Sequence, residues 1–218
     1  MNTRRYIGEN VILCMFSGGL DSTAALYKLL TDKEYDDYDI YVHHIQIINA
    51  AKRHKAEKVA VDNIVKQLRQ GLRVRPFKYS TSTVNTEFLH TPGFRGFMSD
   101  VCLVAFIASQ ICLRNHNIRK FVIGVTNSDK RNPGTAIRNR TIQSIFDAAL
   151  TEGYPETVEY PIYYQIVGDL SKQELWDLLP NNLIALTHSC RKPSYLGDRI
   201  FPCNKCKTCI EINNIKKG

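Results

Sequence analysis

Two groups of residues in this sequence have types and spacings suited to chemistry. The first is FSGGLDST, Phe16 to Thr23, in which two glycines and three hydroxyl side chains follow a short apolar run. Backbone N–H groups of such a turn, at the start of a helix, favour an anion such as phosphate. We expect that a Cβ at Gly18 or Gly19 would clash or forbid a positive φ. The turn matches neither GxxxxGK[ST] nor GxGxxG.

The second group is formed by cysteines near the end of the sequence, with the spacing Cx12CxxCxxC. Four thiolates so close in sequence suit a tetrahedral Zn²⁺, and four protein ligands leave no open position, so the zinc is predicted to be structural. Unligated surface cysteines and an iron–sulfur cluster are the alternatives. Cys14, Cys102 and Cys112 lie in apolar runs and are predicted to be core residues. The predicted metal ligands are Cys190, Cys203, Cys206 and Cys209.

The elements that position these residues alternate between strand and helix patterns. A buried strand at Val11 to Phe16 is followed by a helix at 21–30, a strand at 39–48, a helix at 52–70 and a strand at 72–79. A buried helix at 98–115 and a strand at 121–125 come next, and SKQE (171–174) is a capping box. We predict an α/β fold with a doubly wound, mainly parallel sheet, and ligands at the carboxyl ends of its strands. Residues 1–180 are predicted to form this domain, with a small zinc-binding module at 181–218 packed on it.

Composition narrows the class of protein. The chain has 218 residues, 44% apolar content and a net charge of +8. The longest apolar stretch, Val101 to Cys112, is far shorter than the roughly 20 residues of a membrane span, and the N-terminus lacks a signal-peptide pattern. We expect a cytoplasmic protein with no membrane partner. The basic charge suits an anionic ligand but does not separate nucleotide from nucleic acid, and a solvated basic face is an equal alternative.

SGGLDS resembles the SGGxDS signature of the PP-loop family, the N-type ATP pyrophosphatases, which have a Rossmann-like (HUP) fold. The resemblance implies that the turn binds the β and γ phosphates of ATP with Mg²⁺. It also implies that ATP is cleaved between the α and β phosphates, with AMP transferred to a carbonyl or carboxylate oxygen. Asp21 is then expected to orient the turn or bind Mg²⁺. The implied cofactor-binding residues are Phe16, Ser17, Gly18, Gly19, Leu20, Asp21, Ser22, Thr23, Ile45, Gly124 and Asp129.

The turn and the cysteine tail together are similar to the QueC family, the 7-cyano-7-deazaguanine synthases, which end in a Ser-Cys pair and CxxCxxC around a structural zinc. Further similarities are Arg53-His54 with Glu57 (RHxxE), Pro92 with Arg95, and GVTNSD at 124–129. The resemblance implies adenylation of the carboxylate of 7-carboxy-7-deazaguanine. Ammonia then gives the amide, and a second ATP gives the nitrile. Implied catalytic residues are Asp21, Ser22, Arg53 and Arg95, with Arg138 or Arg140 as further partners for the carboxylate.

The sequence departs from that family after Asp129, where KRNPGTAIRNR replaces a Gly-Tyr-Pro-Asp-Cys-Arg run. We interpret this segment as a basic loop that either receives an acidic partner or is exposed to solvent. A QueC-like paralogue is therefore an alternative, from an antiphage or DNA-modification system, that stops at the amide or joins the deazapurine to a protein amine. A tRNA thiolase, a lysidine synthetase and a zinc-ribbon nucleic-acid binding module are further alternatives. A homodimer is expected.

Overall fold

The chain folds around one five-stranded parallel sheet. The computed structural model describes residues 8–49, 51–87, 100–127, 133–151, 153–156 and 158–216, with the backbone alone for 133–139. The strand order is β3-β2-β1-β4-β5, and every neighbouring pair is parallel. The strands are β1 (Val11–Met15), β2 (Asp39–Ile48), β3 (Phe77–Asn85), β4 (Ile118–Ile123) and β5 (Ile162–Tyr164). The predicted doubly wound α/β fold is confirmed.

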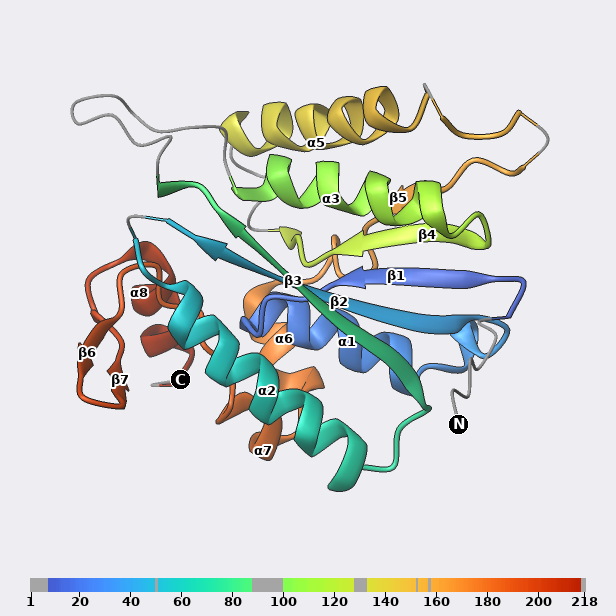
Figure 1. Ribbon diagram of the computed structural model, residues 1–218. Helices are drawn as coiled ribbons and strands as arrows, with labels where there is room; N and C mark the ends of the chain where they lie inside the picture. Colours follow the sequence, from blue (N-terminus) through green and yellow to red (C-terminus); the bar gives the residue numbers. More distant parts are fainter. Residues whose placement is uncertain are drawn as a thin grey trace.

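Helices cover both faces of the sheet (Figure 1). One face carries α1 (Leu20–Thr31) and α2 (His54–Gln70), and the other carries α3 (Asp100–Arg114) and α5 (Pro133–Thr151). Central strand β1 is buried throughout. Ile12 and Cys14 belong to the α1–α2 core, whereas Leu13 and Met15 belong to the α3–α5 core. A strand buried on both faces needs a continuous apolar run, which explains why β1 was readily predicted.

The order of the strands reverses at β1, which lies between β2 and β4. At such a point the loops that leave the carboxyl ends of neighbouring strands diverge and leave a crevice. The glycine turn follows β1 directly, so the fold places it at this crevice.

The structure differs from the sequence predictions in several places. The strand predicted at 121–125 is β4, which lies at 118–123. The third strand was predicted at 72–79 and lies at 77–85, where its serines and threonines gave no apolar signal. The segment after Asp129 was interpreted as a loop, which is wrong from Pro133 onward because α5 begins there. Proline is favoured at the first position of a helix, and its fixed φ suits that start. Strand β5 was not predicted at all.

The C-terminal part begins with α6 (Lys172–Leu178), whose predicted capping box between Ser171 and Glu174 is confirmed. It continues with α7 (Asn181–Ile184), the hairpin of β6 (Ser194–Leu196) and β7 (Arg199–Phe201), and α8 (Lys207–Ile215). A short 3-10 helix, η1 (Lys33–Tyr35), follows α1 earlier in the chain. Leu183 of α7 is buried in the α1–α2 core. The hairpin lies beside the start of α2 (Figure 1), where Tyr195 Oη donates to Lys52 O at 2.7 Å. The division at residue 180 stays a prediction.

Within the described residues, none of the helices has the length and apolar character needed to cross a membrane.

Candidate active site

The glycine turn is fixed to the sheet at its first residue. Phe16 N–H donates to His43 O at 2.8 Å, and His44 Nδ1 lies 2.8 Å from Phe16 O. Burial lowers the pKa of the His44 imidazole, so the ring is neutral and donates through Nδ1. Two consecutive residues of β2 therefore determine where the turn leaves β1.

The two glycines of the turn have different roles. Gly18 has φ +72°, and a Cβ on it would lie 3.0 Å from Val61 Cγ2. Gly19 is the N-cap of α1 with φ −78°, and a Cβ on it would lie 3.4 Å from Ser189 Oγ. The prediction that a side chain is excluded on conformational or steric grounds is right for Gly18 and wrong for Gly19. No neighbouring group of the described chain requires a glycine at 19.

Hydroxyl groups hold the turn in its shape. Ser17 Oγ and Ser22 Oγ lie 3.0 Å apart, and Ser17 N–H donates to Ser22 Oγ at 3.3 Å. Thr23 is buried, and its hydroxyl donates to Gly19 O at 2.8 Å. Thr23 therefore stabilises the turn from its buried side. Ser17 is exposed, and Ser22 lines the cavity described below.

Gly124, which directly follows β4, packs on the first turn of α1. A Cβ at Gly124 would lie 2.6 Å from Ser22 N and 2.8 Å from Asp21 C. Because both contacts are with backbone atoms, a side chain here would displace the start of the helix. The structure thus gives Gly124, predicted as a cofactor-binding residue, a packing role beside the turn.

The turn opens into a cavity of about 260 Å³ at the carboxyl ends of β1, β2 and β4. This volume is slightly below the roughly 300–1,000 Å³ typical of small-molecule sites. One wall is apolar, with Ile45 and Ile47 of β2, Val101 and Val104 of α3, and Ile123. The predicted site residues that line the cavity are Phe16, Ser17, Gly19, Leu20, Asp21, Ser22, Ile45, Arg53, Gly124 and Cys190. Gly18 and Thr23 do not line it.

Lys172, the first residue of α6, reaches the turn from another part of the chain. Its Nζ lies 2.9 Å from Asp21 Oδ2 and 3.2 Å from Asp21 Oδ1. The same Nζ lies 3.8 Å from Glu211 Oε2 in α8. Lys172 therefore adds an ammonium group beside the start of α1, where an anion such as phosphate is favoured. The glycine turn itself contains no Walker lysine.

Arg53 also lines the cavity and lies between two carboxylates. Its Nε is 3.1 Å from Glu57 Oε1, and its Nη2 donates to Asp100. Burial raises the pKa of Glu57, with the neighbouring Asp100 charge adding to the effect and Arg53 opposing it. Arg53, like Lys172, thus lies beside two carboxylates, which reduce the net positive charge that either side chain presents to a ligand.

His43 also lines the cavity and is neutral. Its Nδ1 lies 2.7 Å from Ser80 Oγ and its Nε2 lies 2.9 Å from Ser82 Oγ. Burial lowers the pKa of His43 to about 4. The imidazole is therefore held in place by β3 and contributes no positive charge near neutral pH.

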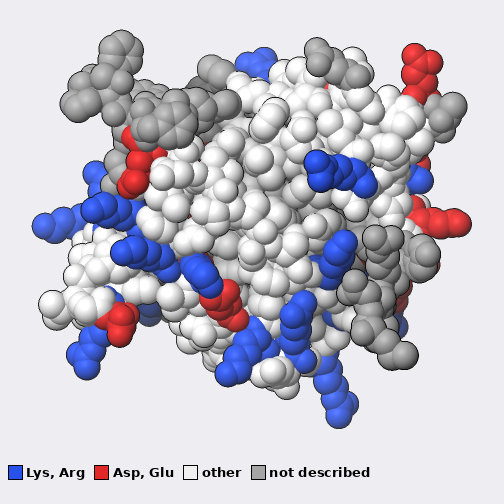
Figure 2. Space-filling view, viewed as in Figure 1, with Lys and Arg blue, Asp and Glu red and all other residues white. Residues whose placement is uncertain are grey.

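The charged residues of the described lining balance one another. The cations are Lys172, Lys207, Arg53 and Arg191, and the anions are Asp21, Glu57, Asp100 and Glu211. A polyphosphate would therefore need charge compensation beyond these side chains. Outside the cavity, Lys and Arg gather over α2 and the C-terminal hairpin, whereas the part over α3 is largely uncharged (Figure 2).

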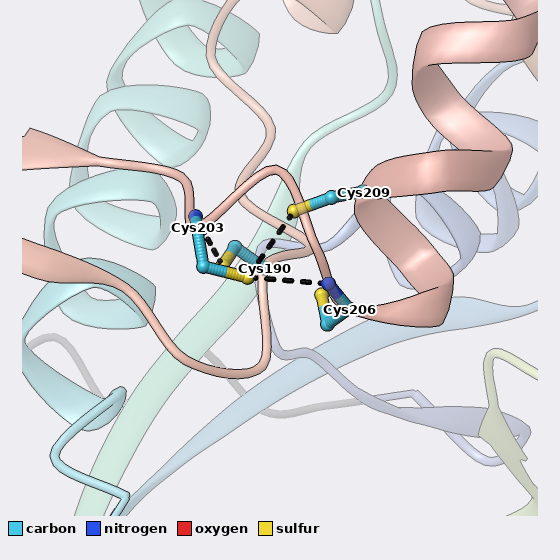
Figure 3. A group of neighbouring side chains, drawn as sticks. All are labelled: Cys190, Cys203, Cys206 and Cys209. Atoms are coloured by element: carbon cyan, nitrogen blue, oxygen red, sulfur yellow. Dashed lines mark hydrogen bonds between the residues drawn. The ribbon is translucent and has the colours of Figure 1, made fainter.

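The four predicted cysteine ligands lie together at the edge of this cavity. Their sulfur atoms all lie within 4.8 Å of one another, and Cys203 Sγ and Cys209 Sγ are 4.0 Å apart. Figure 3 shows the side chains pointing toward one another. Four thiolates on one tetrahedral ion, with metal–sulfur bonds of about 2.3 Å, would lie about 3.8 Å apart, which fits this arrangement. Backbone N–H groups of Lys205 and Cys206 lower the pKa of Cys203 to about 6, whereas burial raises the pKa of Cys190 and of Cys209.

Comparison with known proteins identifies a fold. No protein-family model matches the chain, and no curated protein sequence matches it. A solved structure that resembles it is the U34-tRNA thiolase NcsA from Methanococcus maripaludis with its [4Fe-4S] cluster, at 16% sequence identity and a TM-score of 0.51. The match covers 96% of this chain and 67% of the thiolase. The two chains share a Rossmann-like α/β fold.

Sequence reasoning missed Lys172, Asp100, Lys207 and Glu211. The capping box located the start of α6, but nothing in the spacing shows that this helix begins beside the glycine turn. Conversely, two predicted site residues, Arg95 and Asp129, lie outside the described residues. The same applies to the side chain of Arg138, while Arg140 is exposed and does not line the cavity.

Proposed function

We propose that this protein binds Mg-ATP and transfers AMP to a carboxylate, releasing pyrophosphate. One observation carries the proposal: the SGGLDS turn leaves a buried parallel strand, starts α1 and faces a cavity into which Lys172 extends. The start of α1 and the ammonium group of Lys172 both lie at this cavity, and a helix N-terminus beside a cation suits a pyrophosphate leaving group. The fold shared with the tRNA thiolase supports the assignment to PP-loop chemistry.

In the proposed reaction a carboxylate oxygen attacks the α phosphorus of ATP. The bond from this phosphorus to the oxygen bridging to the β phosphate breaks, and pyrophosphate leaves with that electron pair. The product is an acyl adenylate. Stabilising the charge that develops on the leaving pyrophosphate is the role of the start of α1 and Lys172. A nitrogen nucleophile then attacks the acyl carbon, loses a proton and expels AMP.

Magnesium is part of the proposal because the charged side chains of the described lining balance. A bound Mg²⁺ would supply further positive charge between the phosphates. Asp21 is the carboxylate placed to hold it, either directly or through water, since it lies in the first turn of α1.

The proposed substrate is 7-carboxy-7-deazaguanine, with ammonia as the nitrogen donor and the nitrile as final product. The support is the combination of SGGLDS with Ser189-Cys190 and CxxCxxC, and the apolar wall formed by β2 and α3, which suits a planar heterocycle. The alternative product is an amide, including one formed with a protein amine, because the segment after Asp129 departs from the QueC pattern.

A zinc ion is proposed for the cysteines, since sulfur atoms within 4.8 Å of one another suit a single ion. In a [4Fe-4S] cluster each thiolate binds a different iron, which places the sulfur atoms further apart. A sulfur-transferring enzyme is nevertheless a second candidate, because Cys190 lines the cavity and the structurally similar thiolase carries such a cluster.

The test is incubation of the purified protein with Mg-ATP and 7-carboxy-7-deazaguanine, with and without ammonia, with products identified by mass spectrometry. We expect AMP and pyrophosphate, together with an amide or nitrile when ammonia is present. The Asp21→Ala variant should lose this turnover. Formation of ADP would contradict the mechanism. Absence of turnover in the parent, with polyanion binding retained in Asp21→Ala, would instead support a nucleic-acid binding module.

A further inference from the structure

We infer that the metal site controls how tightly the glycine turn binds the phosphates of ATP, and that Ser189 is the positioning residue through which it does so. This inference rests on the proposed function, because it concerns the same turn and the same ligand. It assigns to the C-terminal cysteines an effect on nucleotide binding in addition to holding their own segment together.

The first connection runs through the two residues that precede Cys190. His188 N–H donates to Gly18 O at 2.9 Å, and Leu20 N–H donates to Ser189 Oγ at 3.0 Å. These contacts join the turn to a segment about 170 residues later in the chain. Cys190, the first metal ligand, is the next residue, so any shift of its position is transmitted to both hydrogen bonds.

Ser189 supplies a side-chain hydrogen-bond acceptor that the start of α1 lacks. The N-cap is Gly19, which has no side chain to accept a hydrogen bond from the first turn. Helices normally obtain such an acceptor from a Ser, Thr, Asp or Asn at this position. Here Ser189 Oγ provides it for Leu20 from outside the helix. The orientation of the helix start, and of the N–H groups that would bind phosphate, thus depends on a residue adjacent to a metal ligand.

A second connection runs through α8. This helix has Cys206 as its N-cap and Cys209 in its first turn, so two of the metal ligands determine where it starts. Its Glu211 contacts Lys172 at 3.8 Å, and Lys172 contacts Asp21 at 2.9 Å. The ammonium group of Lys172 is therefore also held by a residue of α8, the helix whose start is fixed by the cysteine cluster.

The segment between Cys190 and Cys206 has little to hold it without an ion. Leu196 and Phe201 of its hairpin are exposed, and the hairpin strands have three residues each. Binding of an ion to all four thiolates supplies the order that apolar packing does not. Because coupling between two ligands is reciprocal, ATP must stabilise the bound metal by the same factor by which the metal strengthens ATP binding.

The experiment measures binding, with no turnover required. The protein is loaded with Zn²⁺, or stripped with a chelator under reducing conditions. Calorimetry then gives the affinity for two probes, Mg²⁺ with α,β-methylene-ATP and Mg²⁺ with inorganic pyrophosphate. We expect metal removal to weaken both at least tenfold, while circular dichroism shows that the sheet remains folded. In the reverse direction, saturating probe should slow loss of zinc to the chelator.

Three variants isolate Ser189. With zinc bound, Ser189→Ala should bind both probes roughly three- to tenfold more weakly, the loss expected for one hydrogen bond. Ser189→Thr, which keeps the hydroxyl, should restore binding. Ser194→Ala removes an exposed serine of the same segment and should bind like the parent. Removing the metal from Ser189→Ala should then cost less affinity than removing it from the parent, because the two changes affect one connection.

Equal affinity of the loaded and stripped parent for both probes would overturn the inference, and so would parent-like binding by loaded Ser189→Ala. If the stripped protein unfolds, the probe affinities of the three zinc-loaded variants still test the role of Ser189. Metal-dependent probe binding without AMP formation would refute the proposed reaction and keep the coupling. AMP formation by stripped protein, with both probes bound as tightly as by the loaded protein, would refute the coupling and keep the reaction.

Discussion

Lys172 Nζ lies 2.9 Å from Asp21 Oδ2, although the two residues are 151 positions apart in the sequence. Asp21 belongs to the first turn of α1 and Lys172 to the first turn of α6, so two helix starts face the same cavity. In the proposed reaction this lysine would bring positive charge to the place where the leaving pyrophosphate forms, which the carboxylate alone would not do.

Lys172→Ala is therefore expected to lower the turnover of ATP roughly 100-fold or more, as is typical for loss of one group that stabilises transition-state charge. Affinity for Mg-ATP should fall less than turnover. Steady-state kinetics of AMP formation measure both. Lys66→Ala, which removes an exposed lysine of α2, is the matched control and should leave both quantities unchanged. Parent-like turnover in Lys172→Ala would exclude the lysine from the reaction.

Two glycine variants separate packing from ligand binding. Gly124→Ala places a Cβ 2.6 Å from Ser22 N, so we expect a loss of about 1–3 kcal/mol of stability. Gly19→Ala meets only an ordinary contact with Ser189 Oγ at 3.4 Å, so its stability should remain near that of the parent. Affinity for Mg-ATP should nevertheless fall in Gly19→Ala, because the methyl group would lie where the turn approaches the phosphates. Denaturant titration and calorimetry measure the two effects, and unchanged ATP affinity in Gly19→Ala would contradict this placement.

Acidification should destabilise the protein through His43. Its pKa is lowered by burial from 6.5 to about 4, so between these values the unfolded state binds more protons than the folded state. The stabilisation is complete above pH 6.5 and is lost as the pH falls toward 4, by on the order of 1–2 kcal/mol at pH 5. Chemical denaturation at pH 7.5 and pH 5 measures the difference. His43→Gln should show a smaller difference than the parent; an equal one would mean that other groups cause the pH dependence.

Metal content provides an independent test of the cysteine cluster. Elemental analysis of the purified protein should find one zinc per chain, since the four sulfur atoms suit a single tetrahedral ion. Cys206→Ser should lose the metal and lower the melting temperature. Cys14→Ala, which changes a buried cysteine of β1, should keep one zinc per chain. Iron with inorganic sulfide in place of zinc would favour the sulfur-transfer candidate.

The parts of the fold that the sequence predicted well are those with strong local signals. Central strand β1 is a run of apolar residues buried on both faces, and the turn after it has a distinctive motif. The cysteine cluster was also predictable, because three of its ligands are separated by only two residues each. In these cases, the residues that act together are close in sequence.

The remaining features depend on tertiary contacts that leave no local pattern. Edge strand β3 has polar residues such as Ser80 and Ser82, which partner His43 rather than the core. Lys172 reaches Asp21 only because α6 packs beside α1, and Arg53 was predicted to face the substrate without knowledge of Asp100 next to it. Gly19 needed no glycine for its conformation, which the local sequence could not reveal.

The most direct test of the central claim follows the oxygen atoms of the substrate. 7-Carboxy-7-deazaguanine labelled with oxygen-18 in both carboxylate positions is converted with Mg-ATP and ammonia, and the nucleotide product is analysed by mass spectrometry. Attack of the carboxylate on the α phosphorus predicts AMP that carries one oxygen-18. Unlabelled AMP, or ADP as the nucleotide product, would contradict the account.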